Sequence, residues 1–284
     1  MPKIAELPQG SWQFQGVSDD QLQPPKFWGE DQVTRFLAVA HKNSYLTINE
    51  HRSAIKQLNT CLTVYEAAAD SYITHRTACD ADEEDYTGFD VLFAFFMGAQ
   101  KSLYASLCLI FSHQQAEATK TLRGAIETTL YAYHVARSPR ALEIWLERPT
   151  AQHLRNDASA ASARKARSAA GAEFSVPKIL RELAVENSRL ASKFGEKYEE
   201  LIDAGGHYNL PALREQMSIR PSKKLTGRRL DFRLIGATES ERNFALKELM
   251  TISGLVLRAF DLLFSQKWGP DISERISTFN RALR

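Results

Sequence analysis

The sequence predicts an all-α protein, a multi-helix bundle with long antiparallel helices. Two observations carry this prediction: apolar residues recur at helical spacing over most of the chain, and helix-capping residues stand at the ends of the periodic stretches. Of the 284 residues, 44% are hydrophobic, which is enough to bury a sizeable core. Four prolines and little periodicity mark residues 1–30 as an irregular N-terminal arm, and residues 31–284 are expected to form a single helical-bundle domain.

The first half of this domain is expected to begin with a helix over residues 31–45. Thr47 and Glu50 have the spacing of a capping box, and a long helix should follow them to about residue 76. An acidic loop over residues 79–88 should lead to a helix over about 89–113. Since that helix is apolar nearly all round, it is predicted to lie in the middle of the bundle. A further helix is expected over about 115–136.

The middle of the chain predicts shorter and more exposed helices. Ser138 and Pro139 form an N-cap followed by proline in the first turn, which indicates a short helix ending near residue 147. Residues 151–172 are rich in alanine, serine and arginine and predict an exposed helix or a partly ordered excursion. From Pro177 to about residue 203 we expect a pair of helices, the second ended by a glycine pair.

The C-terminal part begins with a different pattern. Weak alternation and a turn signal within residues 217–236 predict a small β-hairpin. Thr238 and Glu241 then form a second capping box, which opens a helix over about 239–266. Gly269 and Pro270 are expected to end this helix, and a short tail helix should follow.

Charge and composition bound the cellular setting. The formal net charge is +2 at pH 7, so a nucleic-acid partner would require a local basic patch. The three cysteines include no Cys-x-x-Cys pair, which favours a reducing compartment. The sequence opens without the apolar region of a signal peptide, and the most apolar stretch, residues 91–112, is interrupted by Gln100 and Lys101. We therefore expect a cytoplasmic protein with no membrane partner.

A polar stripe on the expected helix 115–136 is the first candidate site. Its members fall within about 80° of one another on a helix and are Arg123, Glu127, Tyr131 and His134. Because the stripe borders an apolar stripe directly, it is predicted to form the polar wall of a ligand-binding pocket inside the bundle. The alternative is an ion pair between Arg123 and Glu127 on the helix surface, which contributes only about 0.2–0.5 kcal/mol.

A histidine beyond a glycine-capped helix end is the second candidate. His207 can reach a neighbouring helix from such a place and act as a base, a hydrogen-bond donor or a structural clasp, with Asn209 close by. The alternative is a cap and turn in which both side chains satisfy backbone groups.

A basic segment is the third candidate. Six cations fall within 14 residues: Arg220, Lys223, Lys224, Arg228, Arg229 and Arg233. Phosphate backbones attract such clusters, so the segment is a candidate for nucleic-acid contact. A solvated basic loop is the alternative, because only Phe232 offers a nearby aromatic ring for base stacking.

The sequence lacks the patterns of metal and nucleotide sites. No glutamate is followed by histidine three residues later, His-Glu-x-x-His is absent, and the acidic segment lacks the glycine and glutamate of an EF-hand loop. No P-loop and no Gly-x-Gly-x-x-Gly occur. We expect neither a metal nor a cofactor.

Residues 122–136, LRGAIETTLYAYHVA, followed by Pro139 and Trp145, resemble all-helical bacterial proteins of the HEPN-like type. The segment from Tyr198 to Asn209, which ends Gly-His-Tyr-Asn, is similar too, and the resemblance covers roughly residues 90–265. Many HEPN proteins are metal-independent RNases, toxins or defence components that act as dimers. Their active site uses an Arg, a polar residue and a His within one Arg-x(4–6)-His motif. This chain departs from that motif, because no arginine stands four to six residues before His207.

Three functions remain open. The first is a HEPN-like binding or interaction protein in bacterial defence or stress response, a homodimer with an RNA or protein partner. The second is a metal-independent RNase or toxin with Arg123, Glu127 and His207 as catalytic candidates, in which His207 is the general acid and base and Arg123 stabilises the pentavalent phosphate. The third is a structural scaffold subunit of a larger assembly.

Overall fold

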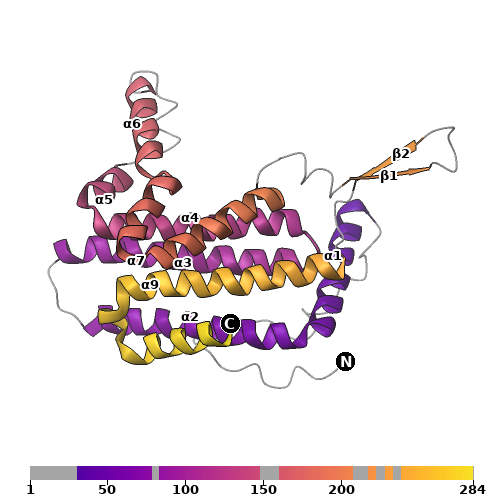
Figure 1. Ribbon diagram of the computed structural model, residues 1–284, viewed down its shortest axis with the longest axis horizontal. Helices are drawn as coiled ribbons and strands as arrows, with labels where there is room; N and C mark the ends of the chain where they lie inside the picture. The colour runs from indigo at the N-terminus through magenta and orange to yellow at the C-terminus, as the bar shows by residue number, and fades with distance from the viewer. Residues whose placement is uncertain are drawn as a thin grey trace.

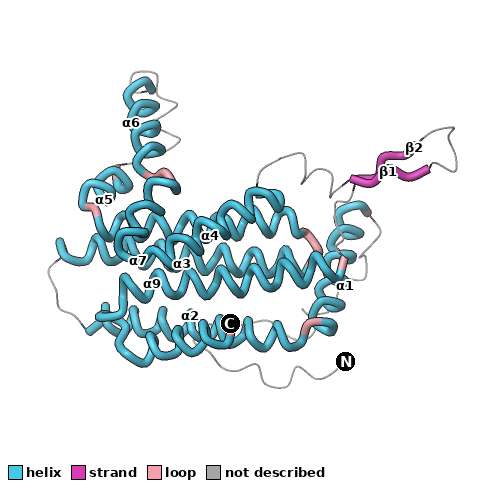
Figure 2. Tube along the Cα trace, viewed as in Figure 1, coloured by secondary structure: helices cyan, strands magenta, loops and turns pink. Residues whose placement is uncertain are grey.

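The computed structural model describes residues 31–78, 83–147, 160–206, 217–221, 228–232 and 238–283. These residues form an all-α bundle of long helices lying side by side, with a small two-stranded sheet beyond one end (Figures 1 and 2). In chain order the elements are α1 (Gln32–Glu50), α2 (Arg52–Ala78), α3 (Glu83–Phe111), α4 (Gln115–Arg137), α5 (Pro139–Leu146), α6 (Ala160–Glu173), α7 (Val176–Leu201), the π-helical turn η2 (Ile202–Gly206), β1 (Met217–Pro221), β2 (Arg228–Phe232) and α9 (Glu239–Ala282). The predicted fold class is confirmed.

The apolar core lies between α2, α3, α4, α7 and α9. Its buried side chains form one connected cluster, in which aromatic rings are prominent. Phe96 is at the centre: its ring stacks on Tyr65 with the centroids 5.4 Å apart, and the edge-to-face contact with Phe260 is at 5.1 Å. Each such pair contributes about 0.5–1.5 kcal/mol beyond the burial of its area, so the core has a specific geometry as well as an apolar composition.

The central position predicted for the most apolar helix is confirmed for α3, which packs on α4, α9 and α1. Within the described residues, Gly88–Phe111 is also the one helical stretch long and apolar enough to cross a membrane by length and composition alone. The core helix of a soluble protein meets the same criterion, and Lys101 lies exposed midway along this one.

Two predicted N-terminal caps are confirmed. The Ser138 side chain accepts a hydrogen bond from the backbone N–H of Ala141 at 3.2 Å, and Pro139 is the first residue of α5. At the start of α9, the Thr238 hydroxyl accepts from the Glu241 N–H at 3.2 Å, and the Glu241 carboxylate accepts from the Thr238 N–H at 2.5 Å. Both motifs are local, so the sequence is sufficient to predict them.

The boundary predicted at Thr47 is wrong. Helix α1 continues through Thr47 to Glu50, and the chain breaks at His51 instead. The Thr47 hydroxyl donates to the backbone carbonyl of Asn43 at 3.0 Å and lies 2.9 Å from the His113 ring Nε2, in the α3–α4 turn. This residue is buried mid-helix, so its hydroxyl satisfies an earlier carbonyl and a tertiary partner in place of an N-terminal amide.

The start predicted for the central helix is also wrong, because α3 begins at Glu83, six residues earlier than expected. The acidic residues 83–85 therefore stand in its first turn and not in a loop.

The pair of helices predicted after Pro177 is present as α7. Its backbone leaves helical geometry at Asn187, with φ −148° and ψ 82°. The Asn187 side-chain oxygen accepts from the Leu190 N–H at 3.0 Å, as an N-cap residue does. The second half of α7 therefore starts as a new helix in a new direction, and η2 continues it to Gly206.

Two peripheral elements fall where the sequence predicts them. Helix α6 projects from the bundle in Figure 1, and most of its described residues are exposed. Strands β1 and β2 lie within residues 217–236 and pair antiparallel, with Ile219 opposite Leu230.

Helix α9 doubles back on itself near Pro270 (Figure 1). In a straight helix, residues 254 and 280 would be about 39 Å apart. Here a Cβ on Gly254 would lie 2.7 Å from the Asn280 side-chain oxygen and 3.0 Å from a Leu283 methyl group. The returning segment, residues 271–283, therefore packs directly against the backbone of the outgoing one, and the absence of a side chain at position 254 permits this approach.

We predict that Gly254→Leu displaces the returning segment. A leucine side chain has no room beside Asn280 and Leu283, and overpacking of this kind costs about 1–3 kcal/mol. The expected result is a lower thermal midpoint and faster amide hydrogen exchange within residues 271–283. Gly171→Leu is the control, since a Cβ at that exposed position meets nothing within 4 Å. An equal effect of the two substitutions would contradict the close approach.

Candidate functional site

Helix α4 buries one face and holds the predicted polar stripe beside it. Leu122, Ile126 and Leu130 of its apolar stripe are fully buried. Arg123 and Glu127 are only partly buried and lie at the border of that face, towards α7. The structure therefore places the stripe at the seam between α4 and α7, where both helices contribute side chains.

Arg123, Glu127 and Tyr198 form one polar group across this seam. The Arg123 Nε is 3.2 Å from Glu127 Oε1, and the side chains are 20% and 26% exposed. The same carboxylate oxygen accepts a hydrogen bond from the Tyr198 hydroxyl of α7 at 3.0 Å. The ion pair is thus held by a third group from a separate helix, which distinguishes it from a pair on a solvated helix surface.

The Tyr198 hydroxyl stays protonated over the physiological range. Burial and the neighbouring Glu127 carboxylate raise its pKa to about 12. A phenol in this state donates a hydrogen bond, and it cannot act as a base near pH 7. Its role in the seam is to orient Glu127, and through it the guanidinium of Arg123.

The turn η2 packs on the same face of α4, one helical turn before Arg123. The Thr119 hydroxyl lies 3.4 Å from the backbone carbonyl of Ala204. Residues four apart share a helix face, so Thr119 and Arg123 point the same way. The chain thus approaches Arg123 just before it reaches His207 and Asn209, which themselves lie outside the described residues.

His134 lies about two turns beyond Glu127 on α4, and its ring lies between two carboxylates. Nδ1 is 2.7 Å from Glu182 Oε2 and Nε2 is 2.9 Å from Glu173 Oε1, while the side chain is only 3% exposed. Lys178 lies 2.8 Å from Glu173, and its hydrogen bond is the main reason why the pKa of that carboxyl is lowered. His134 thus joins α4 to α6 and α7 as part of an ionic cluster.

Tyr131 lies between these two groups. Its ring makes an edge-to-face contact with Phe174, with the centroids 5.3 Å apart, and Phe174 makes a similar contact with the His134 ring at 5.5 Å. The structure therefore brings Arg123 and Glu127 together with Tyr198, and it places Tyr131 and His134 in an adjoining aromatic and ionic group.

The side chains of the basic segment are outside the structural description. Arg220 belongs to β1, and Arg228 and Arg229 belong to β2, where only the backbone is described. The remaining cations, Lys223, Lys224 and Arg233, lie outside the described residues. Figure 1 shows the two strands beyond the end of the bundle at which α1 lies.

A second polar cluster, which the sequence does not predict, lies where α1, α2, the α3–α4 turn and α9 meet. The Arg242 guanidinium pairs with Glu50 at 2.6 Å, and the same carboxylate oxygen is 3.8 Å from Nε2 of His51. The His113 ring, with backbone φ at +61°, contacts Thr47 beside them. Burial and then the Arg242 charge lower the pKa of His113. His51 and His113 are both buried. They are 62 residues apart in the sequence, so no sequence motif predicts that they belong to one cluster.

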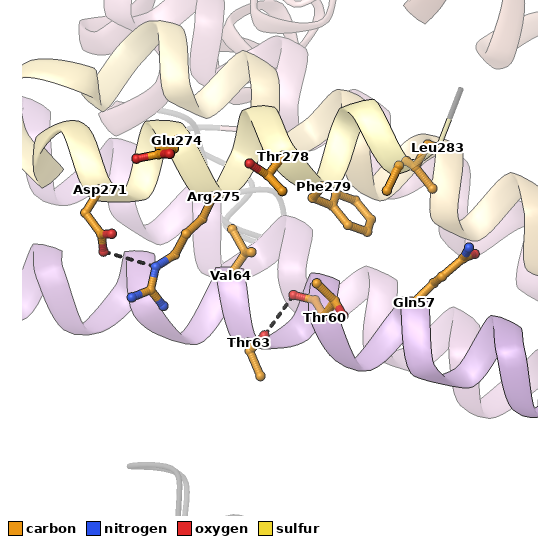
Figure 3. A pocket seen from close by; sticks show the side chains of 11 residues that line it. Gln57, Thr60, Thr63, Val64, Asp271, Glu274, Arg275, Thr278, Phe279 and Leu283 are labelled. Atoms are coloured by element: carbon orange, nitrogen blue, oxygen red, sulfur yellow. Dashed lines mark hydrogen bonds and ion pairs between the residues drawn. The ribbon is translucent and has the colours of Figure 1, made fainter.

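A groove of about 570 Å³ lies between α2 and the returning segment of α9 (Figure 3). Val64 and Phe279 lie at its floor, and threonine hydroxyl groups and the Asp271–Arg275 ion pair lie along its rim. None of the predicted site residues lines it. Among the residues that the structure describes, no group of three or more His, Cys, Asp or Glu side chains is arranged to hold a metal ion.

We predict that His113 makes the fold sensitive to mild acid. Arg242, Glu50 and His51 face this ring, and its lowered pKa means that the folded protein binds fewer protons than the unfolded chain. The free energy of unfolding should therefore be greatest above about pH 6.5 and fall as the pH drops through that value. In His113→Asn, which removes the titration and suits a positive φ, the decrease in thermal midpoint from about pH 7.5 to about pH 5.5 should be smaller.

The control for this prediction is His41→Asn on the exposed side of α1, which should leave the pH dependence as in the unmodified protein. If His113→Asn and the unmodified protein lose the same number of degrees on acidification, the buried histidine does not set the pH dependence.

Comparisons with models of protein families, with curated protein sequences and with solved structures find no match to this chain. The resemblance to HEPN-like proteins therefore stays a prediction. The polar group of Arg123, Glu127 and Tyr198 at the α4–α7 seam carries the functional proposal.

Proposed function

We propose that this protein is a HEPN-like helical binding module that recognises an anionic partner, RNA, at the α4–α7 seam. The observation that carries the proposal is the guanidinium of Arg123, held by Glu127 on its own helix while Tyr198 on the facing helix holds Glu127. The resemblance adds bacterial defence or stress response as the setting, and the sequence composition adds a cytoplasmic location.

The chemistry of the seam supports recognition of phosphate. A guanidinium is planar and presents five donors in a fixed fork, so it can bind a carboxylate and a phosphate oxygen from different directions. Hydrogen bonds between such a group and a phosphate are roughly twice as strong as neutral ones. Because Glu127 and Tyr198 restrict the orientation of Arg123, less side-chain entropy is lost when a ligand binds.

The protonation states at the seam support binding more than catalysis. A general base must be able to take a proton near the working pH. Tyr198 cannot do so with a pKa of about 12. The Glu127 carboxylate already accepts a hydrogen bond from the Tyr198 hydroxyl and pairs with Arg123. Within the described residues, these groups position a cation and do not form an acid–base pair.

Helix α1 supports the homodimer that the resemblance implies. Its large apolar side chains are unusually exposed for one helix and include Val33, Phe36, Leu37, Val39, Tyr45, Leu46 and Ile48. These side chains lie at several positions around α1, and exposed apolar surface is often part of a protein–protein contact.

We predict that Arg123→Ala weakens RNA binding by about tenfold or more, because one charge-assisted contact contributes about 1.5–3 kcal/mol. The measurement is the fluorescence anisotropy of a labelled single-stranded RNA at fixed salt. Arg137→Ala is the matched control: it removes the same charge from the same helix, but Arg137 pairs with Glu186 at the far end. Equal affinity of the two variants, or no binding by the unmodified protein, would contradict the proposal.

The place of η2 favours a metal-independent RNase as the second candidate. The Thr119 hydroxyl lies within hydrogen-bond distance of the Ala204 carbonyl. The chain therefore contacts the face of α4 that carries Arg123 three residues before His207. In this reading His207 acts as general acid and base and Arg123 stabilises the charge of the pentavalent phosphate. A scaffold protein remains the third candidate. For a scaffold, substitution of Arg123 or His207 should change neither the binding nor the cleavage of RNA.

For the RNase we expect His207→Ala to abolish cleavage of a labelled RNA in the presence of EDTA while RNA binding is retained. General acid–base catalysis contributes about 10²–10⁴-fold, so the loss is readily measured by gel electrophoresis. Intact RNA after incubation with the unmodified protein would exclude this candidate and leave the binding module unaffected.

A further inference from the structure

A cavity of about 360 Å³ lies between the bend of α7 and the two antiparallel segments of α9. Asn187 and Leu190 contribute to it from the start of the second half of α7. The outgoing and returning segments of α9 contribute the rest: Arg258, Asp261, Leu262, Ile276, Ser277, Asn280 and Arg281. Its volume is in the range of sites for small molecules.

The charges of this cavity favour an anion. Arg258 and Arg281 reach it from two different segments, and Asp261 is the one acid among the lining residues. The Asp261 carboxylate oxygen Oδ1 already accepts from the Ser273 hydroxyl at 2.6 Å and from the Trp268 ring N–H at 3.3 Å. The carboxylate is thus held by the bend of α9, and it forms no ion pair with either arginine among the described residues.

Arg258 is the most informative residue of the cavity. It is partly buried, and within the part of the chain that the structure describes it makes neither a hydrogen bond nor an ion pair. Burial of a charge without a counter-ion is costly, and Arg258 bears part of that cost. An unpaired guanidinium that lines a cavity therefore points to a negatively charged ligand.

Two of the three uncharged polar side chains in the lining, Asn187 and Ser277, have a donor to offer. The Asn187 side-chain oxygen is used by the Leu190 N–H, so its amide N–H₂ is the group that a ligand could meet. Ser277 offers a hydroxyl. The Asn280 amide, by contrast, already donates to the Ile276 carbonyl at 2.9 Å. A lining rich in donors, with two guanidinium groups, suits the oxygens of a phosphate better than a neutral or cationic ligand.

We propose that this cavity binds the phosphate group of a small molecule, with Arg258 as its principal contact and Arg281, which also donates to the Thr278 hydroxyl at 3.1 Å, as the second. A phosphate monoester carries a charge of about −1.5 to −2 near pH 7, which matches two guanidinium groups. Leu190, Leu262 and Ile276 provide apolar surface for the rest of the molecule. The site is separate from Arg123, since Leu190 lies about two helical turns from Tyr198 along α7.

The test measures binding of inorganic phosphate, adenosine monophosphate and adenosine by isothermal titration calorimetry at constant ionic strength. Both phosphates should bind and adenosine should not. Tighter binding of the nucleotide identifies an organic phosphate as the ligand, and equal binding identifies free phosphate. Arg258→Gln should weaken phosphate binding about tenfold or more, whereas Arg258→Lys should retain part of it as a point charge.

Two further variants make the result independent of folding and of net charge. Arg189→Gln removes the same charge from an exposed position near Asn187 that does not line the cavity, and it should leave the affinity within about twofold of the original. Ser277→Trp fills the cavity from an exposed position and should abolish binding. Absence of phosphate binding, or equal losses in Arg189→Gln and Arg258→Gln, would overturn the proposal. Arg123→Ala should leave phosphate binding at the cavity unchanged. The result of the phosphate experiment is therefore separate from that of the RNA-binding experiment.

Discussion

The rest of the structure depends on α4, a helix that must bury its apolar side in the core and also find partners for the polar groups beside it. One side of this helix is fully buried in the apolar core, and the adjoining side carries hydroxyl, guanidinium, carboxylate and imidazole groups that cannot be buried without partners. Helices α6 and α7 and the turn η2 supply those partners along the seam: Glu173 from α6, Glu182 and Tyr198 from α7, and the Ala204 carbonyl from η2. The polar side of α4 therefore fixes where α7 must lie.

These contacts also explain why α7 bends. Glu127 and His134 are seven residues apart on α4, about 10 Å along its axis, whereas their partners Tyr198 and Glu182 are sixteen residues apart, about 24 Å along a straight helix. A straight α7 could not meet both. The break at Asn187 lies between the two contacts, and its side chain caps the new helix, which reduces the free-energy cost of the interruption.

Sequence patterns could predict what depends on neighbouring residues. Ser138 and Thr238 cap helices as expected, because each needs only the backbone three residues ahead. Thr47 has the same local signature and fails, because the decisive partner, His113, is 66 residues away. The polar stripe of α4 follows from its period, but its pairing with Tyr198 does not, since 71 residues separate Tyr198 from Glu127.

The bend that serves the seam also creates the cavity beside it. A new helix that starts at Asn187 leaves the path of the preceding one, and the returning segment of α9 closes the space so formed without filling it. Leu190 lines this cavity and Tyr198 lies in the seam, on the same uninterrupted stretch of helix. Since a helix of this length moves as a rigid unit, the packing around Leu190 and the orientation of the Tyr198 hydroxyl are set by one and the same element. The arginine at the seam is thus positioned by the geometry of a helix whose other end forms part of a separate, positively charged cavity.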